Sequence, residues 1–351
     1  MSVNNWWQKD CQSPDLKMAE AAQLHQNQLT KPQGALGELE TVAISLAALQ
    51  GRVKPAVDQV ALTVFAADHG VAAKGVSAYP QEVTGQMVLN FASGGAAVTV
   101  LAKQLGASFE VVNLGTVFEV PASDAVICRQ IAPATAPFDE QSAMTEDQLN
   151  QALKVGAERV EQAMNEGAEL FVAGEMGIGN TSAATALAAS LLKLPVEKLA
   201  GPGTGVAGEQ LQHKLLVIQS GLELHKDQSE PVQILRCLGG FEIAAMTGAY
   251  IRAAQLGLPV LVDGFISTVA ALVAVRMQPQ AKKWMLFGHQ SAEPGHQLVL
   301  SSMEARPLLR LDMRLGEGSG AALAVQLLRS ACLLHNTMAT FDSAGVSDRD
   351  D

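Results

Sequence analysis

The chain has 351 residues, of which 48% are hydrophobic but only 4% are aromatic. This length suits one large domain with an accessory part, and the core must be built mainly from aliphatic side chains. The formal net charge of −11 argues against nucleic acid or an anionic membrane surface as a partner. An acidic protein that binds a phosphate must do so locally, through backbone N–H groups and a few well-placed cations.

The cysteines and the apolar stretches favour a protein of the reducing cytoplasm. Cys11, Cys128, Cys237 and Cys332 lie far apart and form no CxxC pair, so neither a disulfide framework nor a zinc site is expected. The first ten residues do not have the pattern of a secretory signal peptide. Charged residues interrupt the apolar stretch 239–275, which is therefore predicted to be buried core rather than a membrane span.

The first 50 residues are predicted to be largely helical. Amphipathic runs span residues 16–29 and 36–49. Between them lies a turn, residues 30–37, in which Pro32 and two glycines interrupt the helical pattern.

The middle of the chain has a different pattern from about residue 59 onward. Short apolar runs rich in β-branched residues alternate with longer Ala-rich stretches, such as 181–192 and 242–256, that are predicted to be helices. This alternation predicts an α/β fold with a mostly parallel sheet covered by helices on both faces. The predicted strands are residues 60–67, 110–114, 170–173, 260–262, 284–287 and 309–315.

The end of the chain is predicted to be helical again, from residue 321 to about 334, before a polar tail. The terminal helices are expected to pack together. We therefore predict an α/β catalytic domain of residues 51–320 and a small helical subdomain made of residues 1–50 and 321–351.

The predicted strands all end in a glycine beside a polar or ionisable residue. Ligands of open parallel sheets bind outside the carboxyl ends of the strands, so six such ends predict one shared cleft. The ends are residues 67–70, 114–116, 174–177, 262–264, 287–290 and 315–318.

A glycine-rich segment, residues 174–187, is the sharpest single element. An apolar strand leads into three spaced glycines, and Asn180, Thr181 and Ser182 then begin an Ala-rich helix. Glycine lets the backbone approach a ligand closely, and the start of a helix offers free N–H donors to an anion. The alternative is an ordinary capped turn between a strand and a helix.

A second glycine-rich segment, residues 201–208, contains the pattern GxGxxG. The preceding stretch looks helical and Asp227 lies outside any predicted strand, so a dinucleotide-binding unit is rejected. We expect this loop to supply more backbone donors, with Lys214 on the next helix as a phosphate contact. The alternative for Lys214 is a solvated surface lysine.

Three carboxylates follow predicted strands, namely Glu175, Asp263 and Glu317. Each sits among glycines and apolar residues with no adjacent Lys or Arg, so partial desolvation is expected to raise its pKa. A raised pKa suits a general base that works near neutral pH. The alternative is a buried hydrogen-bonding carboxylate, which we favour for Asp263.

Other common chemistries find little support. The sequence has neither the GxxxxGK[ST] pattern of P-loop ATPases nor the GxSxG pattern of many serine hydrolases. His289 and His296 match no standard metal-site spacing, so a role in loop structure is preferred and no metal is expected. The pair Asp68-His69 is likewise not expected to bind metal.

Ten segments, in this order, resemble one family: the nicotinate-nucleotide–dimethylbenzimidazole phosphoribosyltransferases, which assemble the lower ligand of cobalamin. They cover almost the whole chain, and their joint occurrence is far more specific than any one motif. The segments are residues 30–40, 68–71, 75–84, 86–91, 174–181, 201–205, 238–242, 263–266, 288–291 and 316–320.

The resemblance implies a reaction. The family transfers 5-phosphoribosyl from nicotinate mononucleotide to 5,6-dimethylbenzimidazole, which gives α-ribazole 5′-phosphate and nicotinate with inversion at C1′. The incoming benzimidazole must lose its ring N–H proton, and the base of the family falls on Glu317. No metal or other cofactor is implied.

The resemblance also assigns site residues. Tyr79, Gln86 and Met87 would line the benzimidazole pocket, and Glu175 would lie near the ribose or the pyridine, as a second catalytic candidate whose assistance to Glu317 stays open. The family fold is a Rossmann-like sheet with a small helical domain, in a homodimer whose subunits share the site. The expected phosphate and further substrate contacts are Gly177, Gly179, Asn180, Thr181, Gly203, Gly205, Lys214, Asp263 and Gly316.

Two alternatives stay open at this level. The first is a related transferase or a hydrolase that releases nicotinate to water, which an apolar pocket around Tyr79 and Met87 would disfavour. The second is a non-catalytic nucleotide sensor, which would not need to keep Glu317.

Overall fold

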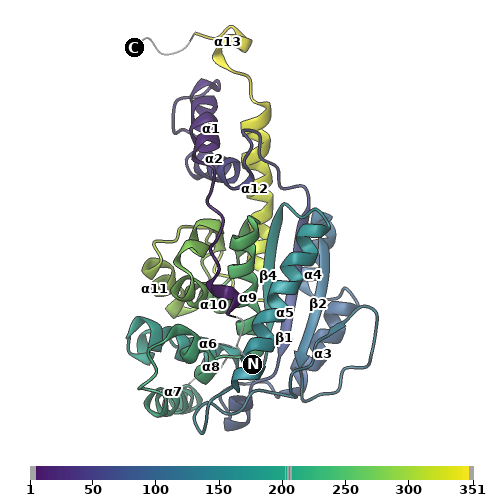
Figure 1. Cartoon of the computed structure of the whole chain (residues 1–351), viewed down its shortest axis with the longest axis vertical. Coiled ribbons are helices and arrows are strands. Elements are labelled where there is room, and N and C mark those ends of the chain that lie inside the picture. Colours follow the sequence, from purple (N-terminus) through teal and green to yellow (C-terminus); the bar gives the residue numbers. More distant parts are fainter. Residues whose placement is uncertain (1–4, 202, 204, 206–207, 348–351) are drawn as a thin grey trace.

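The computed structural model describes residues 5–201, 203, 205 and 208–347, and in that part of the chain a seven-stranded parallel sheet forms the centre (Figure 1). The strand order is β3-β2-β1-β4-β5-β6-β7. Successive strands are thus added to one side of β1 and then, from β4 onward, to its other side, while all strands stay parallel. The strands are β1 (Val60–Ala67), β2 (Ser108–Gly115), β3 (Ile127–Cys128), β4 (Leu170–Met176), β5 (Val260–Val262), β6 (Met285–His289) and β7 (Pro307–Leu309).

Helices cover both faces of this sheet. They are α1 (Leu16–Gln28), α2 (Glu38–Gln50), α3 (Glu82–Ala92), α4 (Ala97–Leu105), α5 (Glu146–Asn165), α6 (Asn180–Leu192), α7 (Gly208–Leu224), α8 (Pro231–Leu238), α9 (Phe241–Leu256), α10 (Phe265–Met277), α11 (Pro294–Ser302), α12 (Ser319–Thr337) and α13 (Phe341–Ala344). Short 3-10 helices are η1 (Trp6–Gln8), η2 (Gly70–Lys74), η3 (Val196–Lys198) and η4 (Pro279–Trp284).

The predicted α/β fold and its parallel sheet are confirmed, and β1 and β5 have the predicted bounds. The strand predicted over 309–315 is wrong, because β7 ends at Leu309. The backbone φ angle is +53° at Asp312 and +66° at Glu317. Such left-handed conformations are incompatible with a strand, so the chain leaves the sheet just before the predicted site.

The core has two halves, one on each face of the sheet. Side chains of β1 alternate between them: Phe65 packs with α5, α6, α9 and α10, whereas Val64 packs with α2, α3, α4 and α12. Both halves are apolar, so every residue of β1 is buried. The sheet is thus held rigidly between two layers, and its carboxyl edge can position a site.

The two ends of the chain meet away from the sheet. Helix α2 packs against both α1 and α12, and Leu29 pairs with Thr340 in an isolated β-bridge. A buried ion pair of 2.8 Å joins Lys31 to Glu40. Figure 1 shows this helical end at the top of the view. The division at residue 321 stays a prediction, since α12 begins against the sheet and continues without a break into the helical end.

One apolar stretch, Glu82–Leu105, has the length and composition of a membrane span. It contains two helices, α3 and α4, with a break at residues 93–96. Each helix is shorter than the about 20 residues that a membrane crossing requires.

The closest helix contact predicts a stability defect. Gly156 of α5 faces α9, and a Cβ built there would lie 1.7 Å from the carbonyl oxygen of Ala245. Gly156→Ala should therefore lower the free energy of unfolding by about 1–3 kcal/mol, because the helices must separate. Urea unfolding measures this, with the exposed position Gln151→Ala on the same helix as the control. Equal stability of the two variants would contradict the close packing.

Candidate active site

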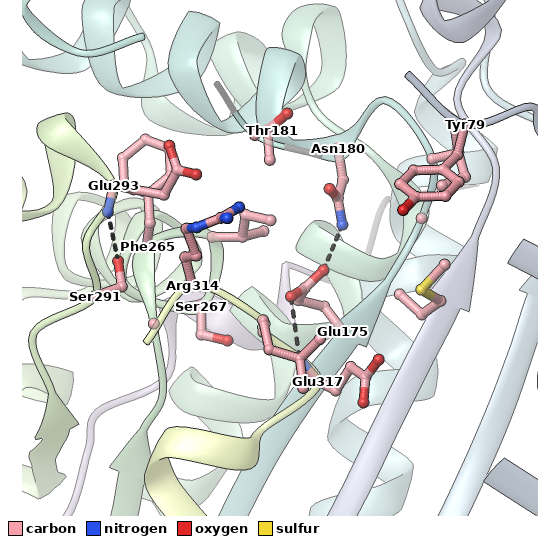
Figure 2. A pocket seen from close by; sticks show the side chains of 18 of the residues that line it. Tyr79, Glu175, Asn180, Thr181, Phe265, Ser267, Ser291, Glu293, Arg314 and Glu317 are labelled. Carbon is pink, nitrogen blue, oxygen red and sulfur yellow. Dashed lines mark hydrogen bonds between the residues drawn. The ribbon is translucent and has the colours of Figure 1, made fainter. Parts of the chain in front are cut away.

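A cavity of about 250 Å³ opens at the carboxyl edge of β4, β5 and β6 (Figure 2). Of the residues predicted from sequence, it brings together eight: Tyr79, Glu175, Gly177, Asn180, Thr181, Gly203, Gly316 and Glu317. Four of the six strand ends that were expected to share a cleft contribute to this cavity, whereas residues 67–70 and 114–116 do not line it.

The other six predicted residues do not line this cavity. Lys214 donates to Thr181 and Asp263 lies 3.5 Å from His289, both of which line the cavity, and Gly179 directly precedes Asn180 in the chain. Gln86 is exposed on α3, while Met87 of the same helix packs against the core between sheet and helices. Gly205 is exposed, with a φ angle of +116°.

The loop that carries Glu317 has an unusual backbone. Gly316, Glu317 and Gly318 have φ angles of +85°, +66° and +87° in succession. The left-handed conformation costs a non-glycine residue roughly 1 kcal/mol or more, and such strain is typical of functional positions. The carboxylate of Asp263 holds the loop by accepting the N–H of Gly318 at 3.1 Å and that of Ala321 at 2.7 Å.

A glycine of β4 makes room for this loop. A Cβ at Gly174 would lie 2.1 Å from the carbonyl oxygen of Glu317. The loop therefore rests directly on the strand, which fixes the height of Glu317 above the sheet.

The Glu317 side chain is 6% exposed, and within the described chain its Oε2 atom has no hydrogen-bond partner. Burial, followed by the charge of Asp263, raises the pKa of Glu317 to about 7. A carboxylate with a free oxygen and such a pKa can accept a proton near neutral pH.

Glu175 is bonded to both neighbouring segments. Its carboxyl group accepts hydrogen bonds from the side-chain amide of Asn180 and from the backbone N–H of Glu317, the latter at 3.4 Å (Figure 2). Burial above all, then the charges of Glu242 and Asp263, raises the pKa of Glu175 well above its usual value. Glu175 is therefore suited to hold Glu317 and Asn180 in place.

At the other end of the cavity, the start of a helix lies beside a buried lysine. Helix α6 begins at Asn180 after Gly179, whose φ angle of +98° is readily adopted only by glycine. Lys214 reaches this point from α7, with Nζ 3.0 Å from Oγ1 of Thr181. Its 1% exposure shows that the alternative of a solvated surface lysine is wrong. Burial lowers the pKa of Lys214 to about 8, and a bound phosphate would raise it again by favouring the charged form.

Of the two histidines expected to structure a loop, His296 is hydrogen-bonded in that way, whereas His289 lines the cavity and its ring nitrogens have no hydrogen-bond partner in the described chain. His296 accepts the N–H of Ser291 at Nδ1 and pairs with Thr268 at Nε2, which agrees with the expected loop role. His289 lines the cavity with Nε2 3.5 Å from Asp263. His69 pairs with buried Glu242 at 2.7 Å. No group of three or more metal-binding side chains occurs among the described residues.

Known proteins with the same sequence pattern and fold are phosphoribosyltransferases. A family model described as phosphoribosyltransferase matches residues 11–346. Proteins named nicotinate-nucleotide–dimethylbenzimidazole phosphoribosyltransferase from Pseudomonas putida and Xanthomonas oryzae are 56% and 57% identical to the chain over 345 residues. These matches cover 98% of the chain, and 98% and 99% of the respective relatives. The chain belongs to the nicotinate-nucleotide–dimethylbenzimidazole phosphoribosyltransferase family.

The structural comparison agrees. A crystal structure of the phosphoribosyltransferase of this name from Thermus thermophilus superimposes with a TM-score of 0.91 at 45% identity, over 95% of this chain and 100% of that one. The resemblance drawn from the motifs is thus confirmed, together with the Rossmann-like α/β fold and the enzyme class, a pentosyltransferase of cobalamin biosynthesis.

Sequence reasoning missed several residues that line the cavity of this phosphoribosyltransferase. They include Phe265, Ser291, Glu293 and Arg314. Arg314 lies in the segment 309–315 that was wrongly predicted as a strand. Its position shows that a cationic residue is close to Glu317 in the sequence. The signal for Glu293 was its place just after the segment 288–291, in the turn that leaves β6.

The raised pKa of Glu317 predicts a stability cost for the phosphoribosyltransferase. The folded-state pKa of about 7 exceeds the usual carboxyl value, so stability falls as pH rises toward 7 and the full penalty remains above it. Glu317→Gln should thus raise the free energy of unfolding by about 1–3 kcal/mol near pH 8 and change it little near pH 4. Urea unfolding at both pH values checks this, and a variant less stable than wild type near pH 8 would contradict it.

Proposed function

We propose that this phosphoribosyltransferase transfers 5-phosphoribosyl from nicotinate mononucleotide to 5,6-dimethylbenzimidazole, with inversion at C1′ and Glu317 as the general base. The products are α-ribazole 5′-phosphate and nicotinate. The observation that carries the proposal is the buried Glu317 carboxylate, whose Oε2 has no partner in the described structure and whose residue lines the cavity. The names of the relatives support the two substrates.

In the proposed step, one ring nitrogen of the benzimidazole attacks C1′ from the face opposite nicotinate, and Glu317 takes the proton from the other nitrogen. The bond between C1′ and the pyridinium nitrogen breaks, and its electron pair neutralises that nitrogen. The leaving group therefore needs no acid, which agrees with a site that offers carboxylates at this end.

The surrounding charges support this chemistry. Positive charge develops on the ribose as the pyridinium leaves, and the buried carboxylate of Asp263 lies behind the Glu317 loop. In the proposal, Glu175 assists by fixing the backbone of Glu317 and the side chain of Asn180. Fixed groups of this kind need no rearrangement during the reaction.

The two ends of the cavity suit the two substrates. The 5′-phosphate would lie at the start of α6, near Gly203 and Lys214. The flat acceptor base would lie against apolar side chains such as Tyr79 and Leu315, which line the cavity. Gln86 and Met87 remain predictions for the acceptor pocket, since neither lines the cavity.

A homodimer in the cytoplasm completes the proposal. Tyr79 and Leu315 line the cavity yet are 55% and 56% exposed. A second subunit that covers this apolar rim would shield the reaction from water, and that would favour the benzimidazole over water as the acceptor.

The acceptor test separates a transferase from a hydrolase. Nicotinate release from nicotinate mononucleotide should be at least ~10²-fold faster with 5,6-dimethylbenzimidazole than without it, because the ribosyl group needs an oriented acceptor. Chromatography of both products measures this. Release that ignores the benzimidazole would refute the transferase proposal, and no release at all would favour the nucleotide sensor.

Glu317 should set the acid limb of the pH profile. A base with a pKa of about 7 must be deprotonated, so kcat/KM of the wild type should rise with pH up to about 7. Glu317→Gln should lower kcat by ~10²–10⁴-fold and remove that limb, with nucleotide binding nearly unchanged. The exposed Glu230→Gln variant, which loses the same charge, is the control. Turnover of the Glu317 variant close to wild type would exclude it as the base.

A further inference from the structure

A carboxylate lies at the proposed phosphate end of the cavity. Glu293 lines the cavity, together with Thr181, Gly203 and Arg314, and Figure 2 shows it on the side opposite Tyr79. The reaction proposed above gives this side chain no task. A negative group is also unexpected beside the subsite for a dianion, because the two charges repel each other.

The contacts of Glu293 are those expected of a bound anion. A Cβ built at Gly201 would lie 2.0 Å from Oε2 of Glu293, and the nearby backbone N–H of Gly203 favours the charged form of its carboxyl group by lowering its pKa. Burial raises the pKa of Glu293, but the positive charges of Lys214 and Arg314 and the Gly203 N–H act in the opposite direction and favour the charged form.

The same donors surround one small space. A Cβ at Gly203 would lie 2.7 Å from Oγ1 of Thr181 and 3.0 Å from Nζ of Lys214. Glu293 is thus held by the glycine-rich loop at the point where the buried lysine and the start of α6 also converge. A phosphate that bound these groups would meet the carboxylate of Glu293.

We propose that Glu293 is a built-in competitor of the substrate phosphate: its carboxylate occupies the anion subsite in the free enzyme and gives way when a phosphorylated ribosyl ligand binds. The inference rests on the proposed function for the identity of that ligand. In the empty site, the negative charge of Glu293 partly offsets the positive charges of Lys214 and Arg314. It also weakens the binding of substrate and product phosphates alike, which favours release of the product.

An alternative role for Glu293 predicts the opposite change in ligand affinity when its charge is removed. A Glu293 that accepted hydrogen bonds from the ribose hydroxyls would add to nucleotide affinity, and its removal would weaken binding. A competitor lowers affinity for phosphate, and its removal must strengthen binding. The sign of the change therefore decides between the two.

The test measures the binding of inorganic phosphate by titration calorimetry. Glu293→Gln should bind phosphate ~3–30-fold more tightly than wild type, because one repulsive charge is removed from a half-buried site. The matched control is Glu209→Gln, an exposed change of the same charge on the helix that carries Lys214, which should alter the affinity less than ~2-fold. Unchanged or weaker phosphate binding by Glu293→Gln would overturn the proposal.

Two further measurements keep the result unambiguous. Thermal unfolding of each variant confirms that it is folded, and Glu293→Ala should change phosphate binding in the same direction as Glu293→Gln. Transfer activity is assayed separately. If wild type fails to use nicotinate mononucleotide while Glu293→Gln still binds phosphate more tightly, the proposed function fails and the competitor role stands. If wild type transfers normally but Glu293→Gln binds phosphate more weakly, the proposed function stands and the competitor role of Glu293 fails.

Discussion

The hydrogen bonds from the backbone of residues 318 and 321 to the carboxylate of Asp263 are the interaction on which the site depends. Asp263 stands at the end of β5 and is 1% exposed, so its charge needs partners. The start of α12 supplies them as N–H donors. In return, the carboxylate holds the strained loop above Gly174, and this gives Glu317 one position. Asp263 is therefore a structural anchor, as the sequence favoured, and Glu317 is the proposed base beside it.

The distribution of charge divides the cavity into two chemically different ends. Glu175, Asp263 and Glu317 lie at one end, and burial raises the pKa of each of them. Lys214 and Arg314 lie near the other end, where Glu293 feels the positive charge of both. A substrate with a cationic pyridinium at one end and a phosphate at the other matches this polarity. The net charge of −11 is thus compatible with phosphate binding, since the cations and helix amides act only at short range.

The sequence predicts those features that depend on local patterns. The apolar strands β1, β2, β4, β5 and β6, the glycine turns after them and the three carboxylates were predictable, because each depends on neighbouring residues, whereas the short edge strands β3 and β7 were not. Arg314 and Glu293 were not, since they reach the cavity from irregular segments whose course is set by tertiary contacts. Arg314 precedes Gly316, and only the left-handed backbone at Asp312 and beyond turns that segment away from the sheet. Gln86 shows the same limit, because helix α3 directs it to solvent rather than into the cavity.

Helix α12 has a consequence for the order in which the protein matures during synthesis. The sheet up to β5 can form as soon as residue 262 has left the ribosome. The N–H groups that bond to Asp263 are synthesised only about 55 residues later. Until that moment the buried carboxylate lacks these two donors, which disfavours early closure of this edge. Helix α12 also packs with α2, which is synthesised near the beginning of the chain. Completion of the catalytic loop and joining of the two chain ends therefore depend on the same late helix, and a truncated chain cannot present a finished site.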